Sequence, residues 1–242
     1  MKKKTTDLSP YRIAITGTTR GIGEQLLKQF TEDPACERIY CLSRHNKNLT
    51  KHSINTKKCI FVKIDLLKPT SIKQQIEESA LANEKHLNFL INNAGLLTNK
   101  PFNELPVKEA MEMFAVNYFS PLELIHTLAG RMCEVKPRHI VNISSMAGVQ
   151  GSMKFPGLVH YGASKAALAS ATEILAEELK EQQISINCLA LGSVDTHMFT
   201  RAFPQGEPQT DAQTIAEYIY SFVIQGWKVV NGKIFPISIT TP

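Results

Sequence analysis

Seven short apolar runs rich in β-branched residues recur along the chain and alternate with segments of helical periodicity. The runs are nearly continuous instead of alternating apolar and polar, which is typical of strands covered on both faces. They span residues 12–16, 38–42, 59–64, 87–91, 139–144, 185–190 and 233–237. The helical patterns between them span residues 23–30, 71–82, 107–132, 161–182 and 211–223.

This alternation of strand and helix predicts an α/β protein with right-handed crossovers. We expect a three-layer, doubly wound Rossmann fold, in which helices cover both faces of a seven-stranded parallel sheet. A chain of 242 residues that is 43% hydrophobic can bury one sizeable core. No linker, repeat or low-complexity segment interrupts it. The sequence therefore predicts one domain over residues 1–242, with a basic tail at residues 1–10.

The net charge of +5 raises the question of a nucleic-acid partner, but three of the positive charges are Lys2, Lys3 and Lys4 in that tail. The other charges are dispersed and form no basic stripe with aromatic residues, so we expect no nucleic-acid partner. The seven histidines show no metal-ligand spacing, and Asp195 with His197 is too little for a site. We therefore expect no metal.

The apolar runs are all too short to cross a membrane, and no apolar stretch follows the basic start as it would in a secretory signal. The five cysteines are scattered and lie mostly in apolar runs. Reduced, buried thiols of this kind are typical of a cytoplasmic protein. We expect no membrane association and a cytoplasmic location.

Three glycines follow the first predicted strand and lead into the first predicted helix. Gly17, Gly21 and Gly23 have the spacing G-x-x-x-G-x-G instead of the dinucleotide fingerprint G-x-G-x-x-G. A helix N-terminus at this place offers free N–H groups and a positive dipole to a pyrophosphate. A glycine-rich turn without a ligand is the alternative for this stretch taken alone.

Further motifs follow in a fixed order after successive strands. They are "TGTTRGIG" (16–23), Asp65, "NNAG" (92–95), Asn117, "NISS" (142–145) and "YGASK" (161–165). With this ordered set the sequence resembles the short-chain dehydrogenase/reductase family over roughly residues 11–237. The resemblance implies a dinucleotide cofactor and an oxidoreductase activity.

Tyr161 and Lys165 lie four residues apart on a predicted helix and therefore share one face. A free phenol titrates near 10, too high for efficient proton transfer at neutral pH. A nearby ammonium group lowers the phenol pKa by about 1 to 3. We therefore expect Lys165 to lower the pKa of Tyr161.

The resemblance assigns catalytic roles to four residues. Tyr161 would be the general acid in carbonyl reduction and the general base in the reverse reaction. Lys165 would tune Tyr161 and bind the nicotinamide ribose. Ser145, with Ser144 as the alternative, would orient the substrate carbonyl, and Asn117 would hold a water that links Lys165 to solvent.

The resemblance also implies a set of cofactor contacts at the strand ends. Asp65 and its neighbour Leu66 would meet the adenine, Asn92 to Gly95 the adenosine, and the loop after residue 190 the nicotinamide carboxamide. The full set is Gly17, Thr19, Arg20, Gly21, Ile22, Gly23, Ser43, Arg44, Asp65, Leu66, Asn93, Ala94, Gly95, Tyr161, Lys165, Gly192, Val194 and Thr196. Leu191 departs from the family, which usually has a proline there, and the family's Asp-Gly-Gly ending is missing.

No carboxylate stands where a dinucleotide fold usually binds the 2′-hydroxyl of NAD. About 20 residues beyond the glycines the chain has Ser43 and Arg44, and an arginine there accommodates the 2′-phosphate of NADP. Arg20, inside the glycine loop, is a second cation that can approach the same phosphate. The sequence therefore predicts NADP(H) as the cofactor.

The substrate pocket is expected between residues 146–160 and 197–210. Its predicted apolar lining is Met146, Phe155, Leu158, Met198 and Phe199. We therefore expect an NADPH-dependent reductase of a small to medium ketone or aldehyde. The alternatives are an NAD-dependent alcohol dehydrogenase and a non-catalytic dinucleotide-binding or dinucleotide-sensing protein, since fold alone does not fix function.

Small residues recur along the helix that Tyr161 opens, at Ala163, Ala167, Ser170 and Ala171. They allow another helix to approach closely, and members of the family commonly pair through this helix. We therefore expect a homodimer or homotetramer. The alternative is that these residues only face the sheet.

Overall fold

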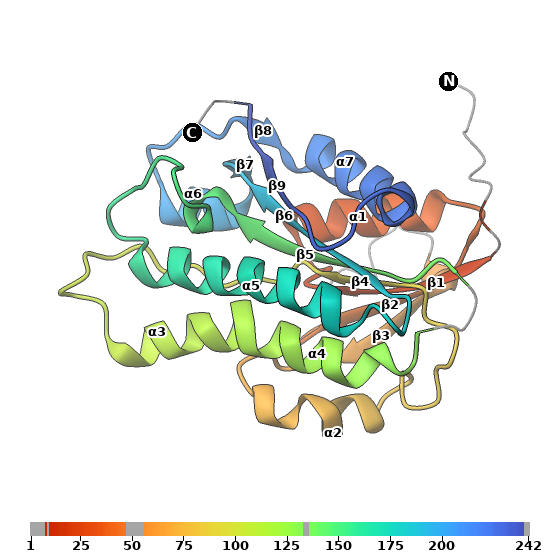
Figure 1. Ribbon diagram of the computed structural model, residues 1–242. Coiled ribbons are helices and arrows are strands. Elements are labelled where there is room, and N and C mark those ends of the chain that lie inside the picture. Colours follow the sequence, from red (N-terminus) through yellow and green to blue (C-terminus); the bar gives the residue numbers. More distant parts are fainter. Residues whose placement is uncertain (1–7, 9, 47–55, 133–135, 240–242) are drawn as a thin grey trace.

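A seven-stranded sheet forms the centre of the computed structural model, which describes residues 8, 10–46, 56–132 and 136–239 (Figure 1). Its strands are β1 (Tyr11–Thr16), β2 (Cys36–Ser43), β3 (Cys59–Lys63), β4 (Phe89–Asn92), β5 (His139–Ser145), β6 (Ser185–Leu191) and β9 (Ile234–Ile237). Each lies where an apolar run predicts it. The lysines of the predicted basic tail and Cys133 lie outside the described residues.

The strand order is β3-β2-β1-β4-β5-β6-β9, and every neighbouring pair is parallel. The chain therefore builds outward from β1 to β3 and then returns to add β4 on the other side of β1. This reversal opens a crevice between the carboxyl ends of β1 and β4, the usual ligand site of such sheets.

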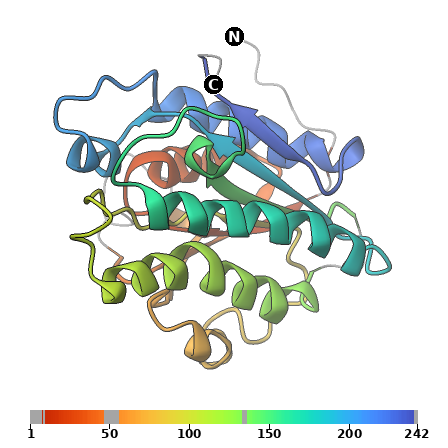
Figure 2. The ribbon, with the colours of Figure 1, turned by 60° about the vertical axis from the view of Figure 1, so that its left-hand side comes forward.

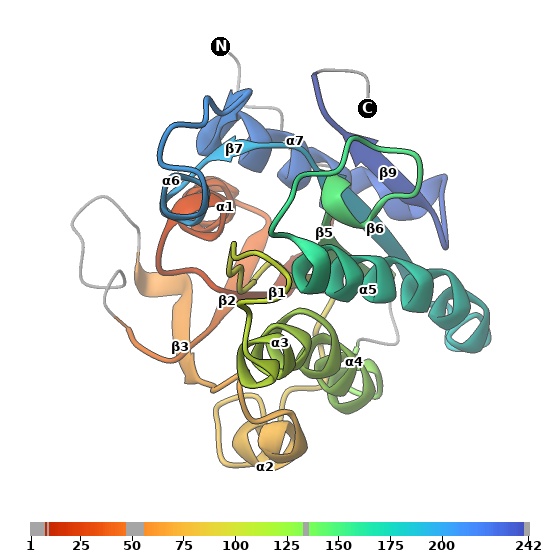
Figure 3. The ribbon, with the colours of Figure 1, turned by 90° about the vertical axis from the view of Figure 1, so that its left-hand side faces the viewer.

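Helices cover both faces of the sheet and give three layers (Figures 1 and 3). One face packs against α1 (Gly21–Glu32) and α7 (Ala212–Gln225), whose apolar sides bury Leu26, Phe30 and Ile219 with the strands. The other face carries α2 (Ile72–Glu77), α3 (Val107–Phe114), α4 (Ser120–Ala129) and α5 (Val159–Glu178). The predicted doubly wound Rossmann fold is confirmed.

The predicted helix over residues 107–132 is wrong in one respect, because it is not continuous. A π-helical segment, η3 (Ala115–Phe119), separates α3 from α4. The apolar periodicity continues through it, so the sequence pattern does not reveal the extra residue in the turn.

The predicted helix over residues 71–82 is also too long, because α2 ends at Glu77. The hydroxyl of Ser79 donates to the carbonyl of Ile76 at 2.8 Å and accepts from the amide of Leu81 at 3.1 Å. These local bonds compete with the helical pattern. The remaining short elements are η1 (Thr56–Lys58), η2 (Pro69–Ser71), η4 (Met146–Gly148), η5 (Gly226–Lys228), α6 (His197–Ala202), β7 (Val194–Asp195) and β8 (Thr210–Asp211).

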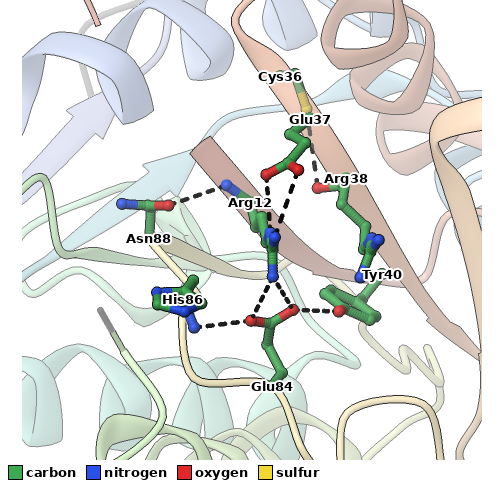
Figure 4. Close-up of polar contacts among 8 residues, drawn as sticks. All are labelled: Arg12, Cys36, Glu37, Arg38, Tyr40, Glu84, His86 and Asn88. Atoms are coloured by element: carbon green, nitrogen blue, oxygen red, sulfur yellow. Dashed lines mark hydrogen bonds and ion pairs between the residues drawn. The ribbon is translucent and has the colours of Figure 1, made fainter. Parts of the chain in front are cut away.

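At the amino edge of the sheet, Arg12 lies between two carboxylates (Figure 4). Its guanidinium contacts Glu84 at 3.0 Å and Glu37 at 2.9 Å. The Glu84 side chain is only 1% exposed, whereas that of Glu37 is 48% exposed. Glu84 also accepts hydrogen bonds from the Tyr40 hydroxyl and the His86 amide. One arginine thus holds a buried and an exposed carboxylate together.

Candidate active site

The hydroxyl of Thr16, the last residue of β1, holds two segments of the site together. It accepts from the amides of Asn93 and Ala94, each at 2.9 Å, while the Asn93 side chain donates to the Thr16 carbonyl at 2.9 Å. The glycine loop after β1 and the segment after β4 are therefore fixed side by side, at the point where the strand order reverses.

The three glycines of the loop have distinct geometric roles. Gly17 has a φ of 73° and Gly21 a φ of 57°, which residues with a side chain rarely adopt. A Cβ at Gly23 would lie 2.1 Å from the Gly17 carbonyl oxygen. The loop therefore turns sharply and packs against its own backbone, a shape that only glycine permits at these positions.

Helix α1 begins directly after this loop without a side-chain cap. Arg20 stands at the N-cap position and its side chain accepts no hydrogen bond from the first turn. The first amides of a helix need an acceptor from outside the helix. An uncapped N-terminus facing a crevice fits a pyrophosphate, because the free N–H groups and the helix dipole both favour an anion.

A cavity of about 1220 Å³ lies at this edge of the sheet. Small-molecule sites commonly occupy about 300–1,000 Å³, so this cavity has room for a dinucleotide and a second ligand. Apart from Asn92, every predicted cofactor contact lines it, as do the five predicted apolar residues. Asn92 does not, because it lies within β4 and its side chain donates to Asn142 at 2.8 Å.

Ser145, Tyr161 and Lys165 line the same cavity. Ser145 is the last residue of β5, and the other two lie near the start of α5. The Lys165 ammonium donates to the Ile143 carbonyl at 2.8 Å, and the Ser144 hydroxyl donates to the Lys165 carbonyl at 2.8 Å. Since the hydroxyl of Ser144 is engaged in this bond, Ser145 is the better placed of the two serines.

Burial decides the pKa values of the tyrosine and the lysine. Burial raises the pKa of Tyr161, and the hydrogen bond between its side chain and that of Ser145 opposes this only in part. The net pKa of Tyr161 thus lies above its ordinary value, and the expected lowering by Lys165 stays a prediction. Burial also lowers the pKa of Lys165 to about 8, because its side chain donates to a neutral carbonyl and has no carboxylate partner.

Asn117 lies in the π-helical segment and is completely buried. Its side-chain oxygen accepts from the Leu96 amide at 2.8 Å, and its nitrogen donates to the Leu96 carbonyl at 2.8 Å and to Ser164 at 3.0 Å. It does not line the cavity. The side chain thus ties the segment after β4 to α5, and the predicted water-holding role stays a prediction.

Aromatic side chains join the two segments expected to close the pocket. The ring of Phe203 lies 5.3 Å from that of Phe199 and 6.3 Å from that of Phe155, measured between centroids. The Asn99 side chain also donates to the Ala202 carbonyl at 2.8 Å. Three loops from distant parts of the sequence therefore meet over the cavity.

Several lining residues were not predicted from the sequence. Helix α6, with Phe203 just beyond it, lies in the predicted pocket segment 197–210 but is too short to give a helical pattern. Glu112 lies in α3, and Val116 lies in η3 next to Asn117. In the sequence only their proximity to Asn117 could have suggested that they line the cavity. Lining residues outside both the predicted set and the predicted pocket segments include His45, Leu97, Glu112 and Val116, whereas Met153, His197, Phe203 and Gln209 lie within those segments.

Two arginines line the cavity, one in the glycine loop and one after β2. Arg44 is exposed and follows β2, next to Ser43 and His45. The Arg20 guanidinium lies 3.1 Å from the His197 ring nitrogen, which links the glycine loop to α6. No aspartate or glutamate occupies the end of β2, as the sequence shows.

No helix within the described ranges is long and apolar enough to cross a membrane. In the same part of the chain, no group of three or more histidine, cysteine, aspartate or glutamate side chains is arranged to hold a metal ion.

Comparison with known proteins agrees with this site. The family described as short chain dehydrogenase matches residues 12–207. The chain belongs to the short-chain dehydrogenase/reductase family. Its members are oxidoreductases, and the arrangement of cavity, glycine loop and Ser-Tyr-Lys group has the place in the fold that this family implies.

Individual relatives share less than a third of their residues with this chain. The chain is 28% identical over 187 residues to a 3-oxoacyl-(acyl-carrier-protein) reductase of Chlamydia muridarum, covering 76% of this chain and 74% of that protein. A 4-hydroxyisoleucine dehydrogenase complexed with NADH superposes with a TM-score of 0.82 at 26% identity, over 94% of this chain and 97% of that chain. A short-chain dehydrogenase of Shigella flexneri complexed with NADP gives a TM-score of 0.83 at 23% identity, covering 96% and 99%, which shows the fold alone.

Proposed function

We propose that this short-chain dehydrogenase/reductase reduces a small to medium ketone or aldehyde to an alcohol with NADPH. The observation that carries the proposal is that Ser145, Tyr161 and Lys165 line one cavity with the glycine loop. A protein that only senses a dinucleotide needs the loop and not the three reactive side chains. Their joint retention favours a catalyst over a sensor.

Each of these side chains has a role in proton transfer. Tyr161, with its pKa raised by burial, is protonated at neutral pH and would act as the general acid, with the positive charge of Lys165 favouring release of its proton. Ser145, within hydrogen-bonding reach of Tyr161, orients the substrate carbonyl. Lys165, whose pKa is about 8, is charged at pH 7 and supplies positive charge beside the reacting oxygen.

The residues of the cavity fit a dinucleotide. The uncapped start of α1 would hold the pyrophosphate, and Asp65 and Leu66 would hold the adenine. Lys165 and Tyr161 would hold the nicotinamide ribose, with Gly192, Val194 and Thr196 beside the carboxamide. The cofactor supplies the hydride, while the protein supplies position and electrostatics.

The choice of NADPH over NADH rests on charge at the end of β2. Arg44 follows Ser43 and shares the cavity wall with Arg20, and no carboxylate stands there to repel a 2′-phosphate. Arg44→Ala combined with Ser43→Asp should narrow or reverse the preference. Wild-type kcat/KM with NADH equal to or above that with NADPH, at one low salt concentration, would overturn this choice and favour an NAD-dependent alcohol dehydrogenase.

The substrate side of the cavity is apolar and aromatic. Met146, Leu158 and Met198 line it together with the three packed phenylalanines at 155, 199 and 203. Such a surface binds hydrocarbon or aromatic groups by burying apolar area. We therefore expect a carbonyl compound with an apolar substituent.

The experiment that tests the proposal follows NADPH oxidation against a panel of aliphatic and aromatic ketones and aldehydes. Turnover of at least one compound that depends on Tyr161 supports a reductase. Tight NADPH binding without turnover of any carbonyl or alcohol would instead favour the dinucleotide-sensing alternative.

The oligomeric state is a separate proposal. Ala163 and Ser170 on α5 are exposed, so the alternative that these small residues only face the sheet is wrong. Helices α3 and α5 lie side by side (Figure 2), and Val107, Met111 and Ile174 on them are 75%, 67% and 59% exposed. Large exposed apolar residues beside small ones suit a helical interface between two copies. Light scattering should give a homodimer or homotetramer, and a monomer of 27.0 kDa at micromolar concentration would refute this.

Two further predictions accompany the function. We propose a cytoplasmic location, supported by the buried thiols of Cys36, Cys41 and Cys188, which form no disulfide. We also propose that the chain acts as one domain, supported by the continuous sheet. Fluorescence microscopy of the tagged chain and a single cooperative unfolding transition are the respective checks.

A further inference from the structure

A second cavity, of about 330 Å³, lies away from the cofactor crevice. It is lined by residues that lie before β5, between α5 and the start of β6, and after α7, at the amino edge of the sheet. Among the described residues that line it none is acidic, and four are cationic: Lys136, Arg138, Lys180 and Lys228. We call this cavity the basic pocket.

The four cations come from three separate parts of the chain. Lys136 and Arg138 lie before β5, Lys180 lies just beyond α5, and Lys228 ends η5 after α7. Like charges gathered around one concave surface repel each other, and such a surface focuses a positive potential. The repulsion between these cations destabilises the empty pocket, and a bound anion would reduce it.

Fixed polar contacts hold the walls of the basic pocket. The Ile186 amide donates to the Asn231 side chain at 2.9 Å, and the indole of Trp227 donates to the Ile224 carbonyl at 2.9 Å. The Arg138 guanidinium donates to the Gln182 carbonyl at 2.5 Å. The pocket is therefore formed before any ligand binds, which reduces the ordering cost of binding.

The turn that carries Lys180 toward β6 is strained. Gln183 in this turn has a φ of 54°, an unfavourable backbone conformation for a residue with a side chain. Its amide donates to the Lys180 carbonyl at 2.9 Å. The tight turn keeps Lys180 close to the start of β6 and so at the rim of the pocket.

Carboxylates near the basic pocket neutralise it only weakly. Glu177 lies 3.2 Å from the Lys180 ammonium, but both side chains are more than 70% exposed, at 76% and 71%. An exposed pair one helical turn apart contributes little and exchanges readily with other partners. The positive character of the pocket therefore persists.

We propose that the basic pocket is a second ligand site, which binds a small anion carrying several phosphate groups. An arginine presents a planar fork of donors and lysines present point charges, a combination that suits phosphate oxygens. The volume is near the lower limit for small-molecule sites, which excludes a large ligand from the interior. Trp227, with the Lys228 ammonium 5.7 Å from its ring centroid, forms one wall.

The chain contains one tryptophan, and it is the one in this wall. Trp227 fluorescence therefore reports binding at the basic pocket directly. We would titrate the full chain, without nucleotide, with inorganic tripolyphosphate and separately with ATP. A saturable change with a Kd tighter than about 1 mM is expected for at least one of them.

Matched variants assign the signal to a site. Lys136→Ala combined with Lys228→Ala should weaken tripolyphosphate binding by about a hundredfold, because each removes a hydrogen bond to a charged group that is worth about one decade in Kd. Lys73→Ala, which removes an exposed lysine of α2, should leave it unchanged. Arg20→Ala combined with Arg44→Ala, in the cofactor crevice, should also leave it unchanged.

Other outcomes overturn the proposal. Loss of the signal in the Arg20 and Arg44 variant, with retention in the Lys136 and Lys228 variant, would place the anion in the cofactor crevice. Equal binding of citrate would remove the preference for phosphate. Tighter binding of a single-stranded oligonucleotide than of tripolyphosphate would indicate a nucleic-acid surface. If neither tripolyphosphate nor ATP gave a saturable change in fluorescence, the basic pocket would not be a ligand site.

Discussion

Two ionisable side chains, Lys165 and Glu84, are buried at opposite edges of the same sheet and have opposite surroundings. Lys165, at the carboxyl edge, is 3% exposed and donates to the neutral carbonyl of Ile143. Glu84, at the amino edge, is 4% exposed and is held by Arg12, Tyr40 and the His86 amide.

The pKa values follow these partners. Burial lowers the pKa of Lys165 to about 8, and Cys188 offsets this loss of hydration only in part. Burial by itself raises the pKa of Glu84, but Tyr40, His86 and Arg12 outweigh it, so this pKa lies below its ordinary value. A buried charged group without an oppositely charged partner has a shifted pKa and is suited to catalysis. A buried charged group that is paired and hydrogen-bonded stays charged and stabilises the fold.

The sharpest test of the carboxyl edge is Tyr161→Phe, which removes the transferable proton and keeps the ring. We expect turnover to fall by at least about 100-fold, the usual scale of acid–base catalysis, with NADPH binding largely retained. Stopped-flow or steady-state rates on a substrate found in the carbonyl panel give the comparison. Tyr218→Phe on α7, outside the cavity, is the control and should keep full activity. Turnover of Tyr161→Phe equal to that of wild type would refute the role of Tyr161 as the general acid.

The amino edge is tested by Glu84→Gln, which keeps the shape and removes the charge. The change replaces one of the two accepting oxygens by an NH2 group, so that Arg12, the Tyr40 hydroxyl and the His86 amide share a single neutral acceptor, and we expect a loss of about 3 kcal/mol in the free energy of unfolding. Urea denaturation measures it. The kcat of the folded fraction should stay near wild type, and a large fall in kcat would contradict the separation between the two edges.

Lys165→Met should act in the opposite direction on stability. The folded protein binds fewer protons at Lys165 than the unfolded chain does between pH 8 and the ordinary lysine value of 10.5, so this group adds stability as pH rises through that window. At pH 7 burying the charged Lys165 costs about 3 kcal/mol of stability, and Lys165→Met removes this cost. The substitution also removes the hydrogen bond to the Ile143 carbonyl, so the net gain in stability is smaller.

We therefore expect Lys165→Met to be about 1–2 kcal/mol more stable than wild type at pH 7, and inactive. Urea unfolding at pH 7 and at pH 10.5 tests this, because the stability advantage should shrink at the higher pH. An advantage that does not change with pH would show that its cause is packing and not charge.

The smallest expected effect belongs to Glu37→Gln, the exposed carboxylate on the same arginine. Because Glu37 is half exposed, its removal should cost less than about 1 kcal/mol. A double-mutant cycle with Arg12→Met should give a coupling energy much smaller for Glu37 than for Glu84. Similar coupling energies would mean that burial does not decide the strength of these pairs.

Much of the fold could be predicted because its strands are covered on both faces and read as apolar runs. The site could be predicted where backbone geometry demands a residue type, as at Gly17 and Gly23, or where a spacing recurs, as with Tyr161 and Lys165. Helix α6 could not, because its six residues are too short for a periodic pattern. Glu84 gave no signal either, since a charged residue in a polar stretch looks exposed, and its burial depends on Arg12 from a distant strand.

The single extra residue of the π-helical segment sets the rotational phase of everything beyond it. In an α-helix each residue turns the chain by about 100°, so one inserted residue rotates α4 by that angle relative to α3. With this phase Asn117 points to Leu96, and Ser120 reaches the Leu66 carbonyl at 2.7 Å. Deleting one residue from 115–119 would restore a regular helix and at the same time misalign these two anchors. Because of the irregular turn, side chains of this helical stretch contact both the loop after β4 and the loop after β3. A regular α-helix would not point both side chains to their partners.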